Sequence, residues 1–264
     1  MDKTPSRIVS LAPSNTEILW ALGLGDRLVG VDSRSNYPPE VRRLPRVGKG
    51  LDIDVGTVAE LKPELVVASL SVPGMERNLP KLETQRLRYV VIDPKSLGDV
   101  LQSILDLGEV TGRVVEAQRL VQQLGDRMDV VASRVSEASA RPGVYWEWWP
   151  RPLITPGRKS WITDMIEMAG GVNVFGDQDR ESVNIDEDMV FTRSPEVIVA
   201  SWCGAEKMAD RERIKGRRGW QILPAVQNDR VYAVEEESFG RPGPRLVEGL
   251  EAVARMLHPE MFEE

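Results

Sequence analysis

The chain contains one histidine, His258, and one cysteine, Cys203, among its 264 residues. A histidine-based zinc or manganese site needs several imidazoles, and a Ser-His-Asp or Cys-His catalytic system needs a histidine beside other reactive groups. His258 instead lies in the C-terminal tail HPEMFEE, and a single cysteine excludes an internal disulfide. These residue types favour a non-catalytic binding protein with no metal site and no required cofactor.

Four of the seven tryptophans, Trp146, Trp148, Trp149 and Trp202, lie in or beside loops that follow predicted strands. In open parallel sheets, ligands bind beyond the carboxyl ends of the strands. Aromatic rings on loops rich in proline and glycine suit a flat, conjugated or amphipathic ligand. Because side chains alternate along WEWW, we expect Trp146 in the core and Trp148 in a cleft. The alternative is that these tryptophans only pack the interior.

Four cationic residues lie in the same loops: Lys49, Arg151, Arg241 and Arg245. Converging arginines can bind amides, carboxylates or phosphate on a ligand, whereas each one alone is typical of a solvated surface charge. The glycine-containing segments GLG and GKG fit neither of the phosphate-binding patterns GxxxxGKS/T and GxGxxG. The acidic run at residues 235–237 is expected to be solvated rather than metal-binding.

Composition limits the class of partner and the location. A formal net charge of -7 argues against a nucleic-acid partner, which needs a basic face. No run approaches the roughly 18 apolar residues of a membrane span. The N-terminal segment MDKTPSR is short and polar, unlike a secretory signal. The sequence as given therefore predicts a cytoplasmic protein; with a trimmed signal it would be periplasmic or membrane-anchored outside the cytoplasm.

Two segments match each other across half the chain: residues 58–70 read VAELKPELVVASL, and residues 190–202 read VFTRSPEVIVASW. Val, Pro-Glu, Val and Ala-Ser recur in identical places at an offset of half the chain length, and Asp54 aligns with Asp186 at the same offset. Each copy combines a helix end, a proline that stops it and an apolar run suited to a buried parallel strand. This repeat predicts two equivalent α/β lobes.

Residues 113–138 predict one long helix of roughly 39 Å, at about 1.5 Å per residue. Its apolar residues recur at steps of three and four and form one stripe. They are Val114, Ala117, Val121, Leu124, Met128, Val131 and Val135. We expect this helix to join the lobes. The predicted domains are an N-terminal lobe of residues 1–112, a bridging helix of residues 113–140 and a C-terminal lobe of residues 141–264.

Strands alternate with helices along both halves, which predicts parallel sheets covered on both faces. The predicted strands are residues 8–11, 29–31, 65–68, 89–92, 143–146, 197–200 and 230–234. Further helices are predicted at residues 79–86, 96–109 and 245–257. Ser14 or Asn15, and Ser160, are the expected helix N-caps. Residues 147–160 and 177–186 are predicted to be loops, and residues 203–219 a polar loop with a short helix.

Five segments resemble the class III substrate-binding proteins of ABC importers, most closely the vitamin B12-binding branch of the iron-siderophore/B12 family. They are RIVSLAPSNTEILWALG, SNYPPE, LKPELVVAS, WPRPLITPGRKSWITDMIEMAGGVNVF and TRSPEVIVAS. The resemblance implies an α/β fold of two doubly wound lobes with parallel-rich sheets, joined by one long bridging α-helix. It also implies non-catalytic binding of cobalamin or a related corrinoid in a cleft between the lobes, for ABC-type uptake or intracellular handling.

The resemblance also assigns residues to the ligand cleft. Tyr37 matches the family's tyrosine before Pro-Pro, and Gly50 lies in the loop that reaches the corrin, where Lys49 or a neighbour replaces an aromatic residue. In the last cleft loop, Ser238-Phe239 stands where the B12 binder carries Trp-Phe. The predicted ligand-binding residues are Asn15, Tyr37, Lys49, Gly50, Ser71, Trp148, Trp149, Trp202, Phe239, Arg241 and Pro242.

Members of the family that dock on a permease place one glutamate on each lobe to meet arginines of the membrane partner. The corresponding positions here are Gly56 and Asp188, which are related by the same offset as the repeat. Glu187 lies beside Asp188, whereas the nearest acid in the first lobe is Asp54. Asp188 and Glu187 are therefore the predicted residues for docking on an ABC permease.

Two alternatives to corrinoid binding stay open. The first is a haem or ferric-siderophore binder of the same fold, in which haem would need a non-histidine ligand such as Tyr37. An anionic siderophore would need converging arginines such as Arg151, Arg241 and Arg245. The second is a two-lobed α/β enzyme, although the chain lacks the cysteine ligands of a metal cluster and a recognisable acid/base pair. We expect a monomer that binds a small molecule and no nucleic acid.

Overall fold

The computed structural model describes residues 4–202 and 208–262, and the chain divides into two compact units. The first unit comprises the described residues up to Pro94, Gly98–Leu124 and Pro242–Pro244. The second comprises Lys95–Leu97, the described part of Gly125–Arg241, and the described residues from Arg245 onward. Helix α5 (Val114–Val135) contributes residues to both units.

The first unit is built on a four-stranded parallel sheet with the strand order β2-β1-β5-β6. Its strands are β1 (Ile8–Ser10), β2 (Leu28–Val31), β5 (Leu65–Ser69) and β6 (Tyr89–Ile92). The core of this unit contains Val9, Val66 and Ala68 from the strands and Leu82 from a covering helix. Short apolar runs of this kind are typical of parallel strands buried on both faces. The strands predicted in this half of the sequence are confirmed.

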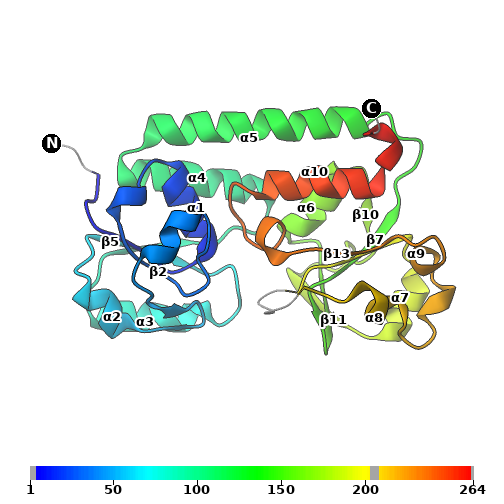
Figure 1. Ribbon diagram of the computed structural model, residues 1–264, viewed down its shortest axis with the longest axis horizontal. Helices are drawn as coiled ribbons and strands as arrows, with labels where there is room; N and C mark the ends of the chain where they lie inside the picture. The colour runs from blue at the N-terminus through cyan, green and yellow to red at the C-terminus, as the bar shows by residue number, and fades with distance from the viewer. Residues whose placement is uncertain (1–3, 203–207, 263–264) are drawn as a thin grey trace. The chain divides into compact units, whose positions relative to one another are not determined.

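Helices cover both faces of the first sheet, with α1 on one side and α2 and α3 on the other (Figure 1). The helices are α1 (Pro13–Ala21), α2 (Val55–Glu60), α3 (Leu79–Thr84) and α4 (Leu97–Thr111). Short 3-10 segments are η1 (Gly25–Arg27), η2 (Pro39–Arg43) and η3 (Met75–Asn78). The GKGLD segment forms a small antiparallel hairpin of β3 (Gly48–Lys49) and β4 (Asp52–Ile53).

The second unit has a sheet of the same plan, with the order β10-β7-β12-β13 and all strands parallel. Its strands are β7 (Gly143–Glu147), β10 (Val172–Asn173), β12 (Val197–Ala200) and β13 (Val231–Ala233). The helices are α6 (Trp161–Met168), α7 (Glu187–Arg193), α8 (Arg211–Lys215), α9 (Pro224–Gln227) and α10 (Leu246–Leu257). The 3-10 segments are η4 (Trp220–Ile222), η5 (Glu236–Ser238) and η6 (Pro259–Met261).

A second, antiparallel sheet of the order β11-β9-β8 lies where the sequence predicts loops. Its strands are β8 (Trp149–Pro150), β9 (Leu153–Pro156) and β11 (Ser182–Ile185). Along β11, buried Val183 and Ile185 alternate with exposed Ser182 and Asn184. This alternation is a strand pattern, but its partner lies far away in sequence among prolines. The loop predictions for these two segments are therefore wrong.

The predicted repeat is a repeat of structure. Helices α2 and α7 begin half a chain length apart, and strands β5 and β12 are related by the same offset. Asp54 and Asp186 both cap the following helix, accepting from Thr57 N at 3.1 Å and Met189 N at 2.8 Å. Lys62 and Ser194, one residue before the shared prolines, both adopt left-handed backbone conformations, with φ of 47° and 46°. The two segments therefore share the start and cap of the helix, the left-handed residue before the proline and the start of the strand.

The predicted stripe of α5 is the buried face of that helix. Ala117, Leu124, Met128, Val131 and Val135 are all buried, and Val121 is partly buried. Val114 differs, because it is the first residue of the helix and is 42% exposed. A regular stripe on an otherwise polar helix is the pattern of one buried face, as predicted.

The start of α1 differs from the prediction. The helix begins at Pro13 with Ala12 as N-cap, so neither Ser14 nor Asn15 caps it. Proline is favoured at the first helical position because its missing N–H has no intrahelical partner there in any case. Ser160 does cap α6, with its hydroxyl accepting from Ile162 N at 3.2 Å.

Candidate ligand-binding site

The carboxyl end of β7 in the second unit carries a charged residue, Glu147, whose side chain is fully buried. Strand pairing places Glu147 beside Ala200, the last residue of β12. Two residues further on, the Trp202 indole Nε1 donates to Glu147 Oε1 at 3.0 Å. A side-chain hydrogen bond thus links the carboxyl ends of two neighbouring parallel strands. Ligands bind beyond the carboxyl ends of the strands in such folds.

Arg217 forms a two-pronged ion pair with this carboxylate. Its Nη1 lies 2.5 Å from Glu147 Oε2, and its Nη2 lies 2.8 Å from Oε1. The guanidinium also lies over the Trp220 ring, 4.5 Å from the ring centroid. Burial lowers the pKa of Arg217, but the hydrogen bond and the charge of Glu147 outweigh it, so the pKa lies above its ordinary value. Arg217 is therefore charged.

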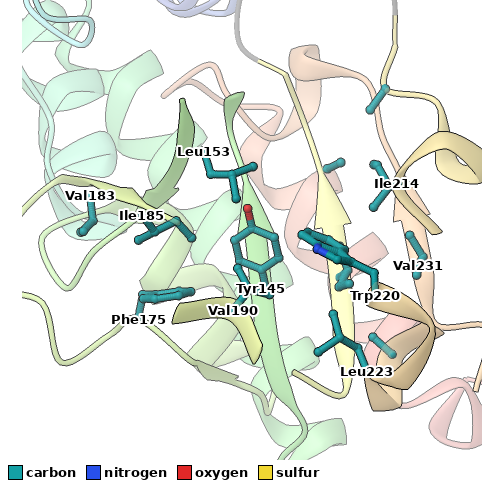
Figure 2. Close-up of a cluster of buried hydrophobic side chains, with 14 residues drawn as sticks. Tyr145, Leu153, Phe175, Val183, Ile185, Val190, Ile214, Trp220, Leu223 and Val231 are labelled. Atoms are coloured by element: carbon teal, nitrogen blue, oxygen red, sulfur yellow. The ribbon is translucent and has the colours of Figure 1, made fainter. Parts of the chain in front are cut away.

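Tyr145, two residues earlier on β7, provides the fourth donor to the carboxylate, with 3.1 Å between its hydroxyl and Glu147 Oε2. Its ring lies in the apolar core of the unit, edge-on to Phe175 and Trp220 at centroid distances of 6.0 and 6.1 Å (Figure 2). Burial, followed by the negative charge of Glu147, raises the pKa of Tyr145 well above 10. The phenol is therefore neutral at physiological pH.

The tryptophans around β7 and β8 differ in exposure. Trp146 is completely buried and packs against Phe239 at 5.7 Å between ring centroids, so the expectation that it is core is confirmed. Trp148 is partly buried beside Trp161, at 6.2 Å. Trp149 is 38% exposed, and its Nε1 donates to Arg151 O at 3.1 Å. Trp149 thus offers more open ring surface than Trp148.

The last loop of the second unit holds its two arginines against one acid. Arg241 Nη2 lies 3.7 Å and Arg245 Nη1 lies 3.4 Å from carboxylate oxygens of Glu237. Both arginine side chains are largely buried, at 10% and 12% exposure. Glu237 is therefore an ion-pair partner, and the expectation that residues 235–237 are all solvated is wrong for it. Phe239 is buried, and its carbonyl accepts from Trp161 Nε1 at 3.2 Å.

In the first unit, a buried acid anchors the loop that contains Tyr37. Asp32 follows β2 and accepts from Arg34 N at 2.9 Å and from the Ser35 hydroxyl at 2.5 Å. That hydroxyl lies 2.8 Å from Thr16 Oγ1 on α1. These hydrogen bonds hold the start of the loop against α1. Tyr37, further along the loop, is 43% exposed.

The other predicted residues of the first unit differ in accessibility. Asn15 is fully buried and donates to the Val67 and Ala68 carbonyls of β5 at 3.3 and 3.0 Å. Its contacts thus connect α1 to the sheet. Lys49 is exposed on β3, and a Cβ on Gly50 would lie 2.6 Å from Met75 Cε.

The remaining predicted contacts lie on loops of the first unit. Ser71 is partly buried and shares a hydrogen bond of 2.9 Å with the Ser69 hydroxyl. Pro242 is buried and belongs to the first unit although its neighbour Arg241 belongs to the second. None of these placements tests ligand contact, so the residues stay predictions.

The residues predicted to dock on a permease are on the surface. Glu187 and Asp188 form the first turn of α7, next to the capping Asp186, and both are exposed. Acidic residues stabilise a helix N-terminus, which is a sufficient local reason for them. Gly56 holds the corresponding place in α2 and is also exposed.

The described residues contain no group of three or more His, Cys, Asp or Glu side chains that could hold a metal ion. His258 is buried, with its Nε2 3.2 Å from Gly170 O, and Cys203 lies outside the described residues. No helix within residues 4–202 and 208–262 has the length and apolarity to cross a membrane.

The prediction from sequence missed the Glu147–Arg217 pair. Arg217 lies in a stretch predicted only as a polar loop, and Glu147 is hidden among the tryptophans of WEWW. One signal was present: a single acid inside a buried strand end requires a partner, because an unpaired buried charge is costly. The partner itself, 70 residues away, follows only from the tertiary fold.

Residues 8–237 match the family described as periplasmic binding protein. An ABC transporter substrate-binding lipoprotein of Bacillus subtilis is 32% identical over 99% of this chain and 83% of its own length. The crystal structure of the periplasmic vitamin B12-binding protein of Vibrio cholerae has a TM-score of 0.81 and 28% identity, covering 98% of this chain and 99% of that one. A periplasmic heme-binding protein of Roseiflexus sp. RS-1 has a TM-score of 0.85 and 25% identity, covering 97% and 99%.

These comparisons correct the predicted location. The family is periplasmic, and the Bacillus subtilis relative is a lipoprotein, so both belong outside the cytoplasm. The prediction of a cytoplasmic protein, which depended on the N-terminal segment, is therefore wrong. The α/β fold with parallel-rich sheets and the interpretation as a non-catalytic binder are confirmed by the same comparisons. The chain belongs to the periplasmic binding protein family, the substrate-binding proteins of ABC transporters.

Proposed function

We propose that the protein binds cobalamin or a closely related corrinoid and delivers it to an ABC permease. The likeness to the vitamin B12-binding protein of Vibrio cholerae, which covers nearly the whole of both chains, is the observation that carries this proposal. Within the family, the ligand class then depends on the charges and aromatic surfaces at the strand ends, and both support a corrinoid.

The charges of the second unit favour a ligand without a strong negative charge. Arg217 is paired with Glu147, and Arg241 and Arg245 are both held by Glu237. A ferric siderophore with several anionic groups would need arginines that are available to it. A corrinoid carries amide groups around a flat ring, and such groups need hydrogen-bonding partners and aromatic surface more than free positive charge.

Two exposed aromatic rings provide surface of this kind, one in each unit: Tyr37 at 43% and Trp149 at 38% exposure. The proposal therefore retains Tyr37 and the Trp148–Trp149 pair as ring contacts, with the other predicted loop residues as their neighbours. It also retains a bridging α5, which supplies residues to both units, and permease docking through Glu187 and Asp188. The proposed unit of function is a monomer.

Haem is the second candidate, favoured by the likeness to the Roseiflexus heme-binding protein. His258 does not suit an axial ligand, because its ring is buried against Gly170. Tyr37 is exposed and would be the candidate ligand. Haem binding therefore predicts a tyrosinate absorption band that disappears in Tyr37→Phe, whereas corrinoid binding retains its absorption in that variant.

The test is a thermal-shift and absorbance titration with cyanocobalamin, cobinamide, haem and a ferric siderophore. A ligand at 1,000 times its Kd stabilises the fold by about 4 kcal/mol, which is readily seen as a rise in Tm. We expect stabilisation by the corrinoids alone. A shift only with haem or the siderophore would overturn the assignment and leave the family intact.

Two variants locate the contacts. Tyr37→Ala and Trp149→Ala each remove an exposed ring and are expected to weaken cyanocobalamin binding about tenfold, without lowering Tm. The matched control is Tyr89→Ala on β6, whose hydroxyl is already bonded to Glu83 at 2.9 Å. If Tyr89→Ala weakened binding as much as the other two, the predicted contacts would be wrong.

A further inference from the structure

Glu147 occupies a position where the fold does not require an acid. The pairing of β7 with β12 matches that of β1 with β5, so the position equivalent to Glu147 in the first unit is Leu11. Leu11 is buried in an apolar core, and its backbone N–H donates to Val67 O at 2.9 Å. A leucine thus fills this strand-end position in a sheet of the same plan.

Stability alone is a weak reason for the buried ion pair. Removing two charges from water costs several kcal/mol per ion, and replacing such a pair with apolar residues of similar size is often neutral or stabilising. The Glu147 carboxylate does provide something that a leucine cannot. It accepts a hydrogen bond from the Trp202 indole while Arg217 and Tyr145 fix both of its oxygens.

Trp202 is placed by two kinds of contact. Its ring packs against the apolar cluster that contains Tyr145 and Trp220, and its Nε1 donates to Glu147 at 3.0 Å. The packing fixes the plane of the ring, and the hydrogen bond fixes its edge. The residue is only partly buried, and it lies two residues beyond β12, at the carboxyl ends of the strands where ligands bind in such folds.

We propose that Glu147 and Arg217 are positioning residues for ligand binding, which hold the Trp202 ring as a preset contact surface for a flat ligand. This inference rests on the proposed function. A ring that is fixed before the ligand arrives loses less conformational entropy on binding, so it strengthens binding without any new contact. Glu147 and Arg217 act through Trp202 and need not touch the ligand.

The experiment is a fluorescence-quenching titration with cyanocobalamin, at a temperature below the Tm of every variant. Trp202→Phe keeps an aromatic ring but removes the N–H donor, and it is expected to raise Kd about tenfold. Glu147→Leu/Arg217→Met removes the acceptor without leaving an unpaired buried charge. That double variant is expected to keep Tm near the wild-type value and to raise Kd by a similar factor.

The two changes act on one contact, so combining them is expected to add no further loss. Near-ultraviolet circular dichroism gives a second readout, because a released Trp202 loses its fixed environment. Glu196→Leu is the control: this carboxylate accepts from Gly143 N at 2.8 Å, at the opposite end of β7, and its loss should leave Kd unchanged. Glu147→Met/Arg217→Met serves if the first double variant does not fold, because it removes the same acceptor and both charges, and the same direction is expected.

Two outcomes would overturn the inference. Either the double variant binds cyanocobalamin as the wild type does, or its loss multiplies with that of Trp202→Phe instead of overlapping. A wild-type protein that binds neither cyanocobalamin nor cobinamide would instead overturn the proposed function, and the inference with it. The wild-type titration therefore separates the two failures.

Discussion

The two parallel sheets share one plan but differ in what stabilises the carboxyl ends of their central strands. In both sheets, two central strands are flanked by one strand on each side. The matching helices and strands lie half a chain length apart. At equivalent positions, the first sheet has Leu11 in an apolar core and the second has Glu147 in a network of four hydrogen bonds. The shared strand order therefore does not determine which residues lie at the carboxyl ends of the strands.

Asp32, a buried acid of the first unit, differs from Glu147 in how far away in sequence its hydrogen-bond partners lie. The Asp32 carboxylate accepts from a hydroxyl and a backbone N–H within three positions in sequence, and its backbone carbonyl accepts from Arg46 Nη1, 14 positions away in the same loop. Glu147 is bonded by Arg217 and Trp202, 70 and 55 positions away. One acid organises its own loop, whereas the other connects distant parts of its unit.

The largest loss of stability is expected when Glu147 of the second sheet is replaced by leucine, the residue at the equivalent position of the first sheet. Glu147→Leu leaves the Arg217 charge buried without its partner, and breaking such a pair costs about 3–5 kcal/mol. Urea denaturation measures the loss in unfolding free energy. Adding Arg217→Met should recover most of it, and a single variant as stable as the wild type would show that the ion pair is dispensable.

A somewhat smaller loss is expected at the equivalent position of the first unit. Leu11→Ala deletes buried methyl groups and leaves a cavity, at a cost of about 3 kcal/mol. Leu11→Met conserves volume and should cost less than about 1.5 kcal/mol. Equal losses for the two substitutions would contradict the apolar description of this edge.

Tyr145→Phe should remove one hydrogen bond to a charged group, at a cost of about 1.5 kcal/mol near neutral pH. The pKa of this phenol is raised in the folded state, so the folded protein holds the proton more tightly than the unfolded chain. Its stabilisation is therefore complete below pH 10 and is lost as the pH rises above it. Tm measured from pH 8 to 11 should fall less steeply in Tyr145→Phe than in the wild type.

The smallest effects should be nearly equal in the two units. Asp54→Ala and Asp186→Ala each remove an N-cap from a short helix and should lower Tm by a few degrees. The hydrogen bond from Thr57 lowers the pKa of Asp54, so its contribution is present at neutral pH and is lost as the pH falls below about 4. Markedly unequal shifts at pH 7 would show that the repeated segments differ in energy despite their shared geometry.

Local pattern alone was sufficient for most of the fold. Short continuous apolar runs predicted the strands β5, β6 and β12, and the spacing of apolar residues predicted the buried face of α5. The same applies to the repeat, because Asp54 and Asp186 cap their helices through bonds within three residues. These features depend on contacts near in sequence, which a linear pattern records.

Only the tertiary structure determined the polar contacts at the carboxyl end of β7 in the second sheet. Glu147 meets Arg217 because the fold brings the end of β7 beside a segment that follows β12, and no spacing in the sequence encodes that meeting. The strands β8, β9 and β11 were missed for the same reason, since their pairing partners are distant in sequence or contain proline. Helix and repeat signals are local and additive, so the sequence by itself determined the order of helices and strands. Charge partners and antiparallel pairings are set by long-range packing, so only the tertiary structure determined the polar contacts of Glu147.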